Sequence, residues 1–177
     1  GYRVDARRCI SYWTIEQNGV IPRWVMERMG QRIFGCADCT VVCPWNAKAD
    51  APILAALEAR PENRAPKLLE LLNYRDEDAF KARFAGSPVL RIGAAGFARN
   101  IVIGLASCAT AGSRKAVAER MAADRDAVVR CTAVWAAFRL GLPIEAARSD
   151  PDKRVRQMAQ QVLDQEPALP PSAPSRF

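Results

Sequence analysis

The fold is decided by residues 125–140, which read RDAVVRCTAVWAAFRL. Apolar residues recur three and four positions apart in this stretch, so they share one face of a helix: Val129, Ala133, Ala136, Ala137 and Leu140. Gly141 and Pro143 follow at once, and both residue types commonly end helices. The stretch therefore predicts an amphipathic α-helix.

A second helix is predicted earlier in the chain. Asp76 is a good N-cap for a helix that carries Phe80 and Phe84 four positions apart. Gly86 follows, where the chain can leave the helix.

A third helix is predicted near the end of the chain. Asp150 followed by Pro151 has the pattern of an N-cap and a first helical residue. The apolar residues behind them fall on one helical stripe: Val155, Met158, Ala159, Val162 and Leu163. No alternating strand pattern of any length occurs in residues 51–165, so this part is predicted to be all-α.

The predicted helices repeat a short pattern. An arginine opens the apolar part of three of them, at intervals of about 30 residues: Arg99, Arg130 and Arg156. Asp126 and Asp152 each stand four positions before such an arginine, and these pairs indicate a structural link between turns or repeats. Helical pairs of this length stack into solenoids, so we predict HEAT-like helical repeats over residues 51–165.

The charge balance favours an acidic partner. The chain has 26 Lys and Arg residues against 19 Asp and Glu, a net charge of +7, and no His. The lack of His excludes His-based nucleophile activation, His general bases and His-ligated zinc. The positive excess is typical of proteins that bind nucleic acid or phosphorylated substrates, although an Arg-rich and Ala-rich coding style would give the same balance.

The most informative motif is residues 35–44, which read GCADCTVVCP. The spacing C-x2-C-x3-C-P is the end of the ferredoxin run C-x2-C-x2-C-x3-C-P. In that run a compact loop directs several thiolates to one [4Fe–4S] cluster, while the last Cys can bind a second cluster. Ile33 stands where a complete run would have its first Cys.

Cys9 is the remaining candidate ligand in the first 50 residues. The pattern then places three thiols on one cluster and the fourth on another: Cys9, Cys36 and Cys39, and Cys43. Two clusters need more ligands than these, and the first residue is not Met, so we expect an N-terminal part of the protein outside this chain. A four-thiolate zinc site is the alternative, but the C-x3-C-P ending favours iron–sulfur. Cys108 and Cys131 lie in predicted helices and are interpreted as small buried residues.

Three strings resemble the epoxyqueuosine reductase family. They are DARRCISY at residues 5–12, GCADCTVVCPWN at residues 35–46 and FKARFAGSP at residues 80–88. The resemblance extends over about residues 1–165. It covers the second cluster motif of that family and the start of its C-terminal helical-repeat domain.

This resemblance implies an activity, cofactors and a domain organisation. Members of the family are cytoplasmic oxidoreductases that reduce epoxyqueuosine to queuosine in tRNA, using a cobalamin and two [4Fe–4S] clusters. Their cobalamin domain and catalytic residues precede the DARRC string, so we expect no catalytic residue in this chain. The expected domains are a ferredoxin-like 4Fe-4S cluster-binding segment at residues 1–50, HEAT-like repeats at residues 51–165 and a disordered tail at residues 166–177.

The resemblance also implies roles for single residues. Cys9, Cys36 and Cys39 would bind the second cluster and Cys43 the first, with Ser11 and Ala37 close to the corrinoid. Trp13 and Ala37 depart from the residues that the family commonly has. A corrinoid and iron–sulfur reductase that acts on another substrate is therefore an alternative, as are an iron–sulfur electron carrier and a zinc-stapled helical-repeat binding module.

The expected partners are tRNA, bound at its anticodon region, and an electron donor protein. We expect a monomer. We also expect no membrane partner, because no signal peptide and no long apolar stretch stand out. Arg91 and Arg114 are the candidate RNA contacts, since neither occupies the repeated Asp/Arg position. Trp24 and Trp45 would either stack a base or shield a cluster from solvent.

Overall fold

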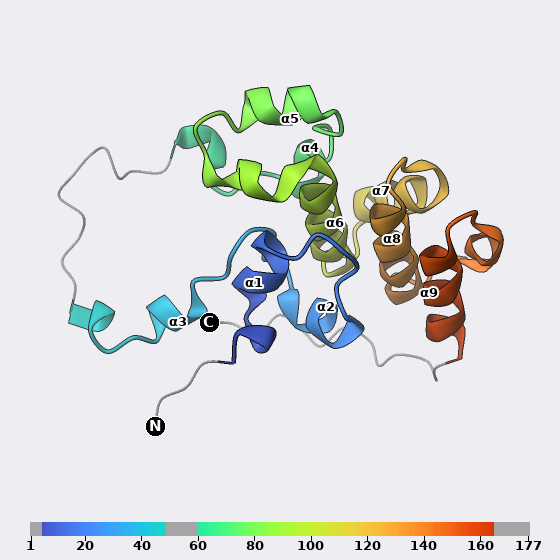
Figure 1. The fold of residues 1–177 in the computed structure, drawn as a ribbon, viewed down its shortest axis with the longest axis horizontal. Helices are drawn as coiled ribbons and strands as arrows, with labels where there is room; N and C mark the ends of the chain where they lie inside the picture. The colour runs from blue at the N-terminus through green and yellow to red at the C-terminus, as the bar shows by residue number, and fades with distance from the viewer. Residues whose placement is uncertain (1–4, 49–59, 165–177) are drawn as a thin grey trace.

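The computed structural model describes residues 5–48 and 60–164, and these residues form helices joined by short turns (Figure 1). The N-terminal part contains η1 (Ala6–Arg8), α1 (Ile10–Ile15), α2 (Arg23–Met29), α3 (Asp38–Val41) and η2 (Asn46–Lys48). The rest contains η4 (Pro61–Asn63), α4 (Leu68–Leu71), α5 (Glu77–Arg83), η5 (Pro88–Ile92), α6 (Gly93–Ala106), α7 (Ala111–Ala123), α8 (Ala127–Arg139), η6 (Glu145–Ser149) and α9 (Lys153–Leu163). No strand occurs in these two ranges, which confirms a mostly α fold. The predicted tail and the predicted boundary at residue 50 lie outside the described residues.

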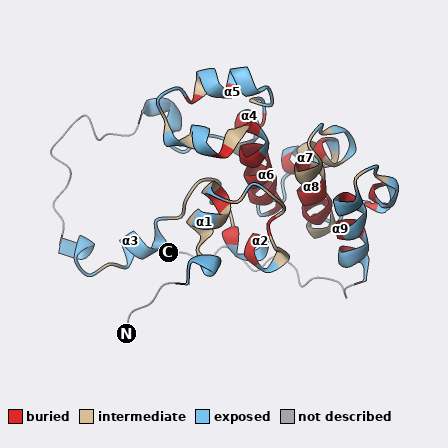
Figure 2. Ribbon diagram, viewed as in Figure 1, coloured by how far each residue is buried: buried red, intermediate tan, exposed pale blue. Residues whose placement is uncertain are grey.

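The longest helices form a stack, with α8 in its middle (Figure 1). Helix α8 packs against α6, α7 and α9, and η6 packs against α9. Buried residues concentrate in α6 and α8 (Figure 2). All five apolar residues predicted for one face of α8 are buried. Gly141 follows the helix with φ of 66°, as predicted for its end.

Helices α5 and α8 each begin at a capping aspartate. The Asp76 carboxylate accepts hydrogen bonds from the backbone N–H groups of Asp78 and Ala79, which confirms the predicted start of α5. The Asp126 carboxylate likewise accepts from Val128 at 2.7 Å and from Val129. These side chains satisfy N–H groups that have no partner in the first turn of a helix.

The predicted start of α9 is wrong by two residues. Asp152, not Asp150, is the N-cap, and its carboxylate accepts from the N–H of Arg154 at 2.8 Å. Asp150 lies in the preceding turn, where its carboxylate accepts from the N–H of Asp152 and from Arg130. In the predicted apolar stripe of α9, four residues are buried, whereas Leu163 is 40 % exposed.

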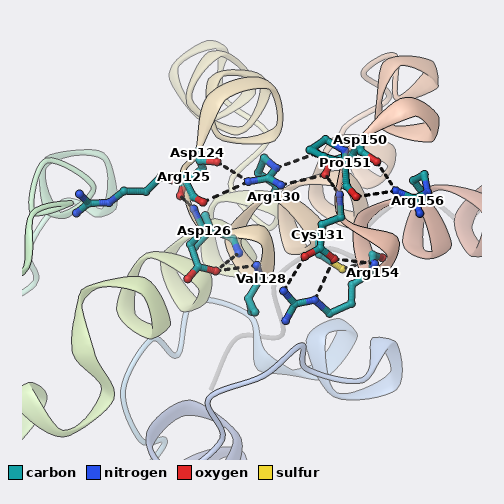
Figure 3. Close-up of polar contacts among 12 residues, drawn as sticks. Asp124, Arg125, Asp126, Val128, Arg130, Cys131, Asp150, Pro151, Arg154 and Arg156 are labelled. Carbon is teal, nitrogen blue, oxygen red and sulfur yellow. Dashed lines mark hydrogen bonds and ion pairs between the residues drawn. The ribbon is translucent and has the colours of Figure 1, made fainter.

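The repeated arginines do form structural links, but not with the aspartates that precede them (Figure 3). Asp126 and Asp152 cap their own helices. Arg130 instead binds both carboxylate oxygens of Asp150, at 2.8 and 3.0 Å, and so joins α8 to the turn before α9. Arg156 donates to the carbonyl oxygens of Asp150 and Pro151. Arg130 therefore links α8 to the turn before α9, whereas Arg156 binds that same turn from within α9.

The N-terminal helices share the core of the stack. Ile21 and three residues of α2, which are Val25, Met26 and Met29, are almost completely buried and belong to the same hydrophobic cluster as α6 and α8. Both α1 and α2 contact α6. The segment that carries the candidate cysteines is therefore docked on the first long helix of the stack.

Residues 88–106 are long and apolar enough to meet the length and composition criteria for a membrane span. They comprise η5 and α6, and 67 % of the most apolar window is buried inside the protein. Its apolar composition is thus explained by its place in the core.

Candidate metal centre

Cys9 lies in the turn between η1 and α1. Its backbone ends η1 and caps α1, while its side chain is half-buried. Asp5 caps η1 and also forms an ion pair with Arg7 at 2.9 Å. The indole N–H of Trp13 donates to the carbonyl of Arg7 at 2.7 Å. These contacts fix the backbone on both sides of Cys9.

Cys36 stands in a sharp turn that packs on α1. The residues on both sides have left-handed backbone, with φ of 70° at Gly35 and 56° at Ala37. The N–H of Gly35 donates to the hydroxyl of Thr14 at 2.9 Å. The hydroxyl of Ser11 donates to the sulfur of Cys36 at 3.9 Å. The turn is therefore attached to α1 through two side chains of that helix.

Cys39 and Cys43 lie on α3 and in the turn that follows it. Cys39 is exposed and Cys43 is half-buried. Asn46 donates to the carbonyl of Thr40 at 2.9 Å, and Arg32 pairs with Asp38 at 3.1 Å. No residue of α3 or η2 is buried, so this stretch projects from the rest of the described protein (Figure 2).

The donor chemistry suits a thiolate-bound metal. The four cysteines are free thiols and fall within one segment that has no His. Thiolates alone bind iron–sulfur clusters or structural zinc. Within the described ranges, however, no three Cys, Asp or Glu side chains gather closely enough to hold one metal ion. The structure thus attaches the Cys36 turn to the helix that follows Cys9, and leaves the ligand set itself a prediction.

Ser11 and Ala37 are both adjacent to Cys36, one through space and one along the chain. The Ser11 hydroxyl contacts the Cys36 sulfur, and Ala37 is the next residue in the chain. Ser11 is half-buried and Ala37 exposed. Their predicted role as neighbours of a corrinoid stays a prediction.

The other two cysteines differ from each other. Cys131 is 1 % exposed on α8, and burial raises the pKa of its thiol to about 12, so it behaves as a small apolar residue as predicted. Cys108 lies in the turn after α6 and is only half-buried. Its sulfur accepts from the amide of Gln31 at 3.4 Å, so it contacts the N-terminal segment.

A basic hollow of about 640 Å³ opens beside Cys9. Asp5, Arg7, Arg8, Trp24 and Arg28 line it. The hydrogen bonds from Arg7 hold the pKa of Asp5 below its ordinary value, so the single acid stays ionised and paired. Trp24 is 42 % exposed and packs edge-on against Trp13, with ring centroids 6.3 Å apart. Sequence analysis missed this hollow, because its two halves come together only when α2 folds against α1.

The two predicted RNA-contacting arginines have partners within the protein. Arg91, on η5, pairs with Glu16 at 2.9 Å and is 66 % exposed. Arg114, in the first turn of α7, donates to the carbonyl of Leu140 at the end of α8. Both remain predictions, but part of their hydrogen-bonding capacity is already used. Trp45 is 88 % exposed and leaves the aromatic face open.

Comparison with known proteins identifies the N-terminal segment. Residues 1–46 match the family described as 4Fe-4S double cluster binding domain. This match bears on the choice between iron and zinc, because the family binds iron–sulfur clusters. It covers all four candidate ligands.

The sequence is similar to curated epoxyqueuosine reductases. That of Alicycliphilus denitrificans is 39 % identical over 142 residues, which are 76 % of this chain and 39 % of the relative. That of Escherichia coli is 43 % identical over 104 residues, which are 59 % of this chain and 27 % of the relative. The chain therefore spans less than half the length of these relatives.

Solved structures of epoxyqueuosine reductases share the fold. The Bacillus subtilis structure has a TM-score of 0.77 and 29 % identity, covering 91 % of this chain and 44 % of that chain. A structure with an epoxyqueuosine-modified tRNA-Tyr stem loop gives the same values. The predicted resemblance is confirmed, and the relatives are reductases by name.

Proposed function

We propose that this chain supplies the cluster ligands and an RNA-docking scaffold of an epoxyqueuosine reductase. The observation that carries the proposal is the match of residues 1–46 to the double-cluster domain, on a chain whose relatives are epoxyqueuosine reductases. In this proposal Cys9, Cys36 and Cys39 bind one [4Fe–4S] cluster. Cys43 binds a second, whose other ligands lie outside this chain.

Reduction of an epoxide to an alkene consumes two electrons and two protons and releases water. Iron–sulfur clusters deliver electrons singly, so a cluster-bearing segment is suited to relay them from an electron donor protein. A cobalamin supplies the reducing chemistry when bound, and most of its contacts would come from outside this chain. Ser11 and Ala37 would lie close to it, because the Ser11 hydroxyl contacts the Cys36 sulfur and Ala37 follows Cys36 in the chain.

The helical stack would serve as the docking scaffold. The relatives act on tRNA, and one was solved with a tRNA stem loop. We propose that α6 to α9 form HEAT-like repeats and that the basic hollow is a contact for RNA, because arginines bind phosphates and Trp24 offers an aromatic surface to a base. Arg91 and Arg114 stay as further candidate contacts. The enzyme would be cytoplasmic and monomeric.

The test is metal analysis and turnover of the complete protein, prepared without oxygen. We expect about eight iron atoms and labile sulfide per chain, as two cubane clusters require, together with reduction of epoxyqueuosine in tRNA. A Cys36→Ser variant should lose iron and activity together, whereas Cys131→Ser, on α8, should keep both. Zinc without labile sulfide would instead establish a structural metal module. Iron–sulfur without epoxide reduction would establish an electron carrier or a reductase of another substrate.

A further inference from the structure

Arg99 and Asn100, on α6, are completely buried but do not link helices of the stack. In this they differ from Arg130, which joins α8 to the turn before α9, and from Arg156, which binds that turn from α9. The Arg99 guanidinium donates to the carbonyl oxygens of three residues of the cysteine-bearing segment: Trp13, Gln17 and Gly19. Arg99 has the same position in the repeat pattern as Arg130 and Arg156, but its partners lie in the N-terminal segment.

Asn100 bridges two parts of that segment. Its amide nitrogen donates to the carbonyl of Thr14 at 2.8 Å and to the carbonyl of Ile33 at 2.9 Å. Its amide oxygen accepts two hydrogen bonds from Arg99, at 3.0 and 2.9 Å. The opposite orientation of the amide would set N–H against N–H and oxygen against oxygen, so this network fixes it. An amide group has two N–H donors, and each serves a different segment.

The network reaches the two cysteines through Thr14, which is also completely buried. The Thr14 hydroxyl donates to the carbonyl of Ile10 at 2.9 Å and accepts from the N–H of Gly35 at 2.9 Å. Ile10 directly follows Cys9, and Gly35 directly precedes Cys36. Each cysteine is therefore one residue away from an atom that this network holds.

Helix α1 needs such support because it has only six residues. A helix this short is not stable alone in water, and its last carbonyl groups have no partner within it. Arg99 donates to the carbonyl of Trp13 and places a positive charge at the C-terminal end of α1, where the helix dipole favours a cation. Burial lowers the pKa of Arg99 to about 10, which still leaves it charged at neutral pH.

We propose that Arg99 and Asn100 are positioning residues for the metal centre, and that they hold the Cys9 helix and the Cys36 turn at the spacing one cluster requires. The proposal rests on the assignment of Cys9 and Cys36 as ligands. It gives α6 two roles, as the first long helix of the stack and as the support of the ligand segment. Residues that orient metal ligands usually change metal affinity when they are replaced.

The experiment, in the complete protein, compares a buried arginine that binds the cysteine-bearing segment with one that binds the helical part. Asn100→Asp replaces the amide nitrogen, which donates to Thr14 and Ile33, by an acceptor oxygen. Arg99→Lys removes the planar guanidinium with its several N–H donors. Arg120→Lys is the matched control, because Arg120 is buried and its partners in the described part of the chain, Leu72 and Asp124, lie within the helical part. We expect Asn100→Asp and Arg99→Lys to retain iron about 10- to 100-fold more weakly against a chelator, and Arg120→Lys to retain it as the parent does.

A second measurement needs no metal. In the metal-free protein, the N–H of Gly35 should exchange with solvent faster in Asn100→Asp and in Thr14→Val, and at the parent rate in Thr14→Ser, which keeps the hydroxyl, and in Arg120→Lys. Thr14→Val leaves α6 intact, so it remains informative if an α6 variant does not fold. Unchanged Gly35 exchange in Asn100→Asp, or equal loss of iron in Arg120→Lys, would overturn the proposal. If the metal proves to be zinc, the proposed function fails, but the exchange experiment still tests whether Asn100 positions the Cys36 turn.

Discussion

At the scale of single residues, the Arg130–Asp150 pair joins α8 to the turn before α9 (Figure 3). Two parallel hydrogen bonds join groups that are only 13 % and 10 % exposed. Arg130 also donates to the carbonyl of Asp124, so it connects the turn before α8 with the turn before α9. A largely buried charge that loses its partner costs more than an exposed one, because solvent cannot replace the contact.

We therefore expect Arg130→Gln to lower the free energy of unfolding by about 2–4 kcal/mol. Arg154→Gln is the control, because it breaks a pair with Asp152 in which Arg154 is about half exposed, and we expect it to cost less than about 1 kcal/mol. Urea unfolding at pH 7 measures both. Equal losses in the two variants would contradict the reading of Arg130 as a buried link.

The pH dependence of this contribution has a definite sign. Arg130 holds the pKa of Asp150 below its ordinary value, so the pair stabilises the fold fully above about pH 4, where Asp150 is ionised even in the unfolded chain. Its contribution is lost as the pH falls below that. The difference between the parent and Arg130→Gln should accordingly shrink as unfolding is measured from pH 7 toward pH 3. A constant difference would mean that the charge of Asp150 is not involved.

At the scale of elements, α8 depends on its cap. Asp126 accepts from two N–H groups of the first turn, and α8 lies in the middle of the stack. Asp126→Ala should lower the free energy of unfolding by about 1 kcal/mol, whereas Asp126→Ser, which keeps an acceptor oxygen, should recover most of the loss. Thermal unfolding followed by circular dichroism measures both. Equal stability of the Ala and Ser variants would show that the cap contributes nothing.

Element prediction from sequence succeeded where local chemistry decides the structure. The spacing of apolar residues and the Asp76 cap predicted α5 and α8, and both are confirmed. The start of α9 was misplaced because Asp150 and Asp152 have the same capping chemistry, and the distant Arg130 decides between them. A sequence pattern holds no information about such a contact.

The same limit applies to the candidate site. Cysteine spacing predicted iron–sulfur chemistry, and the match of residues 1–46 to a 4Fe-4S double cluster binding domain supports it, whereas the ligand set stays a prediction. The roles of Arg99 and Asn100 could not be predicted, since their partners lie more than 60 residues away. Arg99 matched the repeat pattern, and only the folded structure separates it from Arg130.

At the scale of the whole molecule, only part of the positive charge behind the net charge of +7 is accessible to a binding partner. Several arginines are committed to internal carbonyl or carboxylate groups, among them Arg99, Arg120 and Arg130. The arginines around the basic hollow are exposed and stand next to an exposed tryptophan. The hollow is therefore one place where exposed positive charge and an aromatic side chain lie together, although Arg7 pairs with Asp5 and Arg28 donates to the carbonyl of Trp24.

Binding of a tRNA stem loop should accordingly weaken as salt rises, with a slope that counts the phosphates contacted. Arg28→Gln should weaken binding about equally for all RNA sequences and reduce the slope by about 1. Arg154→Gln, on α9 and paired with Asp152, serves again as the control and should leave the slope unchanged. Titrations of labelled stem loop at several salt concentrations measure it. If Arg28→Gln binds as the parent does while Arg154→Gln loses slope, RNA docks on the far end of the stack, and the hollow beside Cys9 needs another explanation.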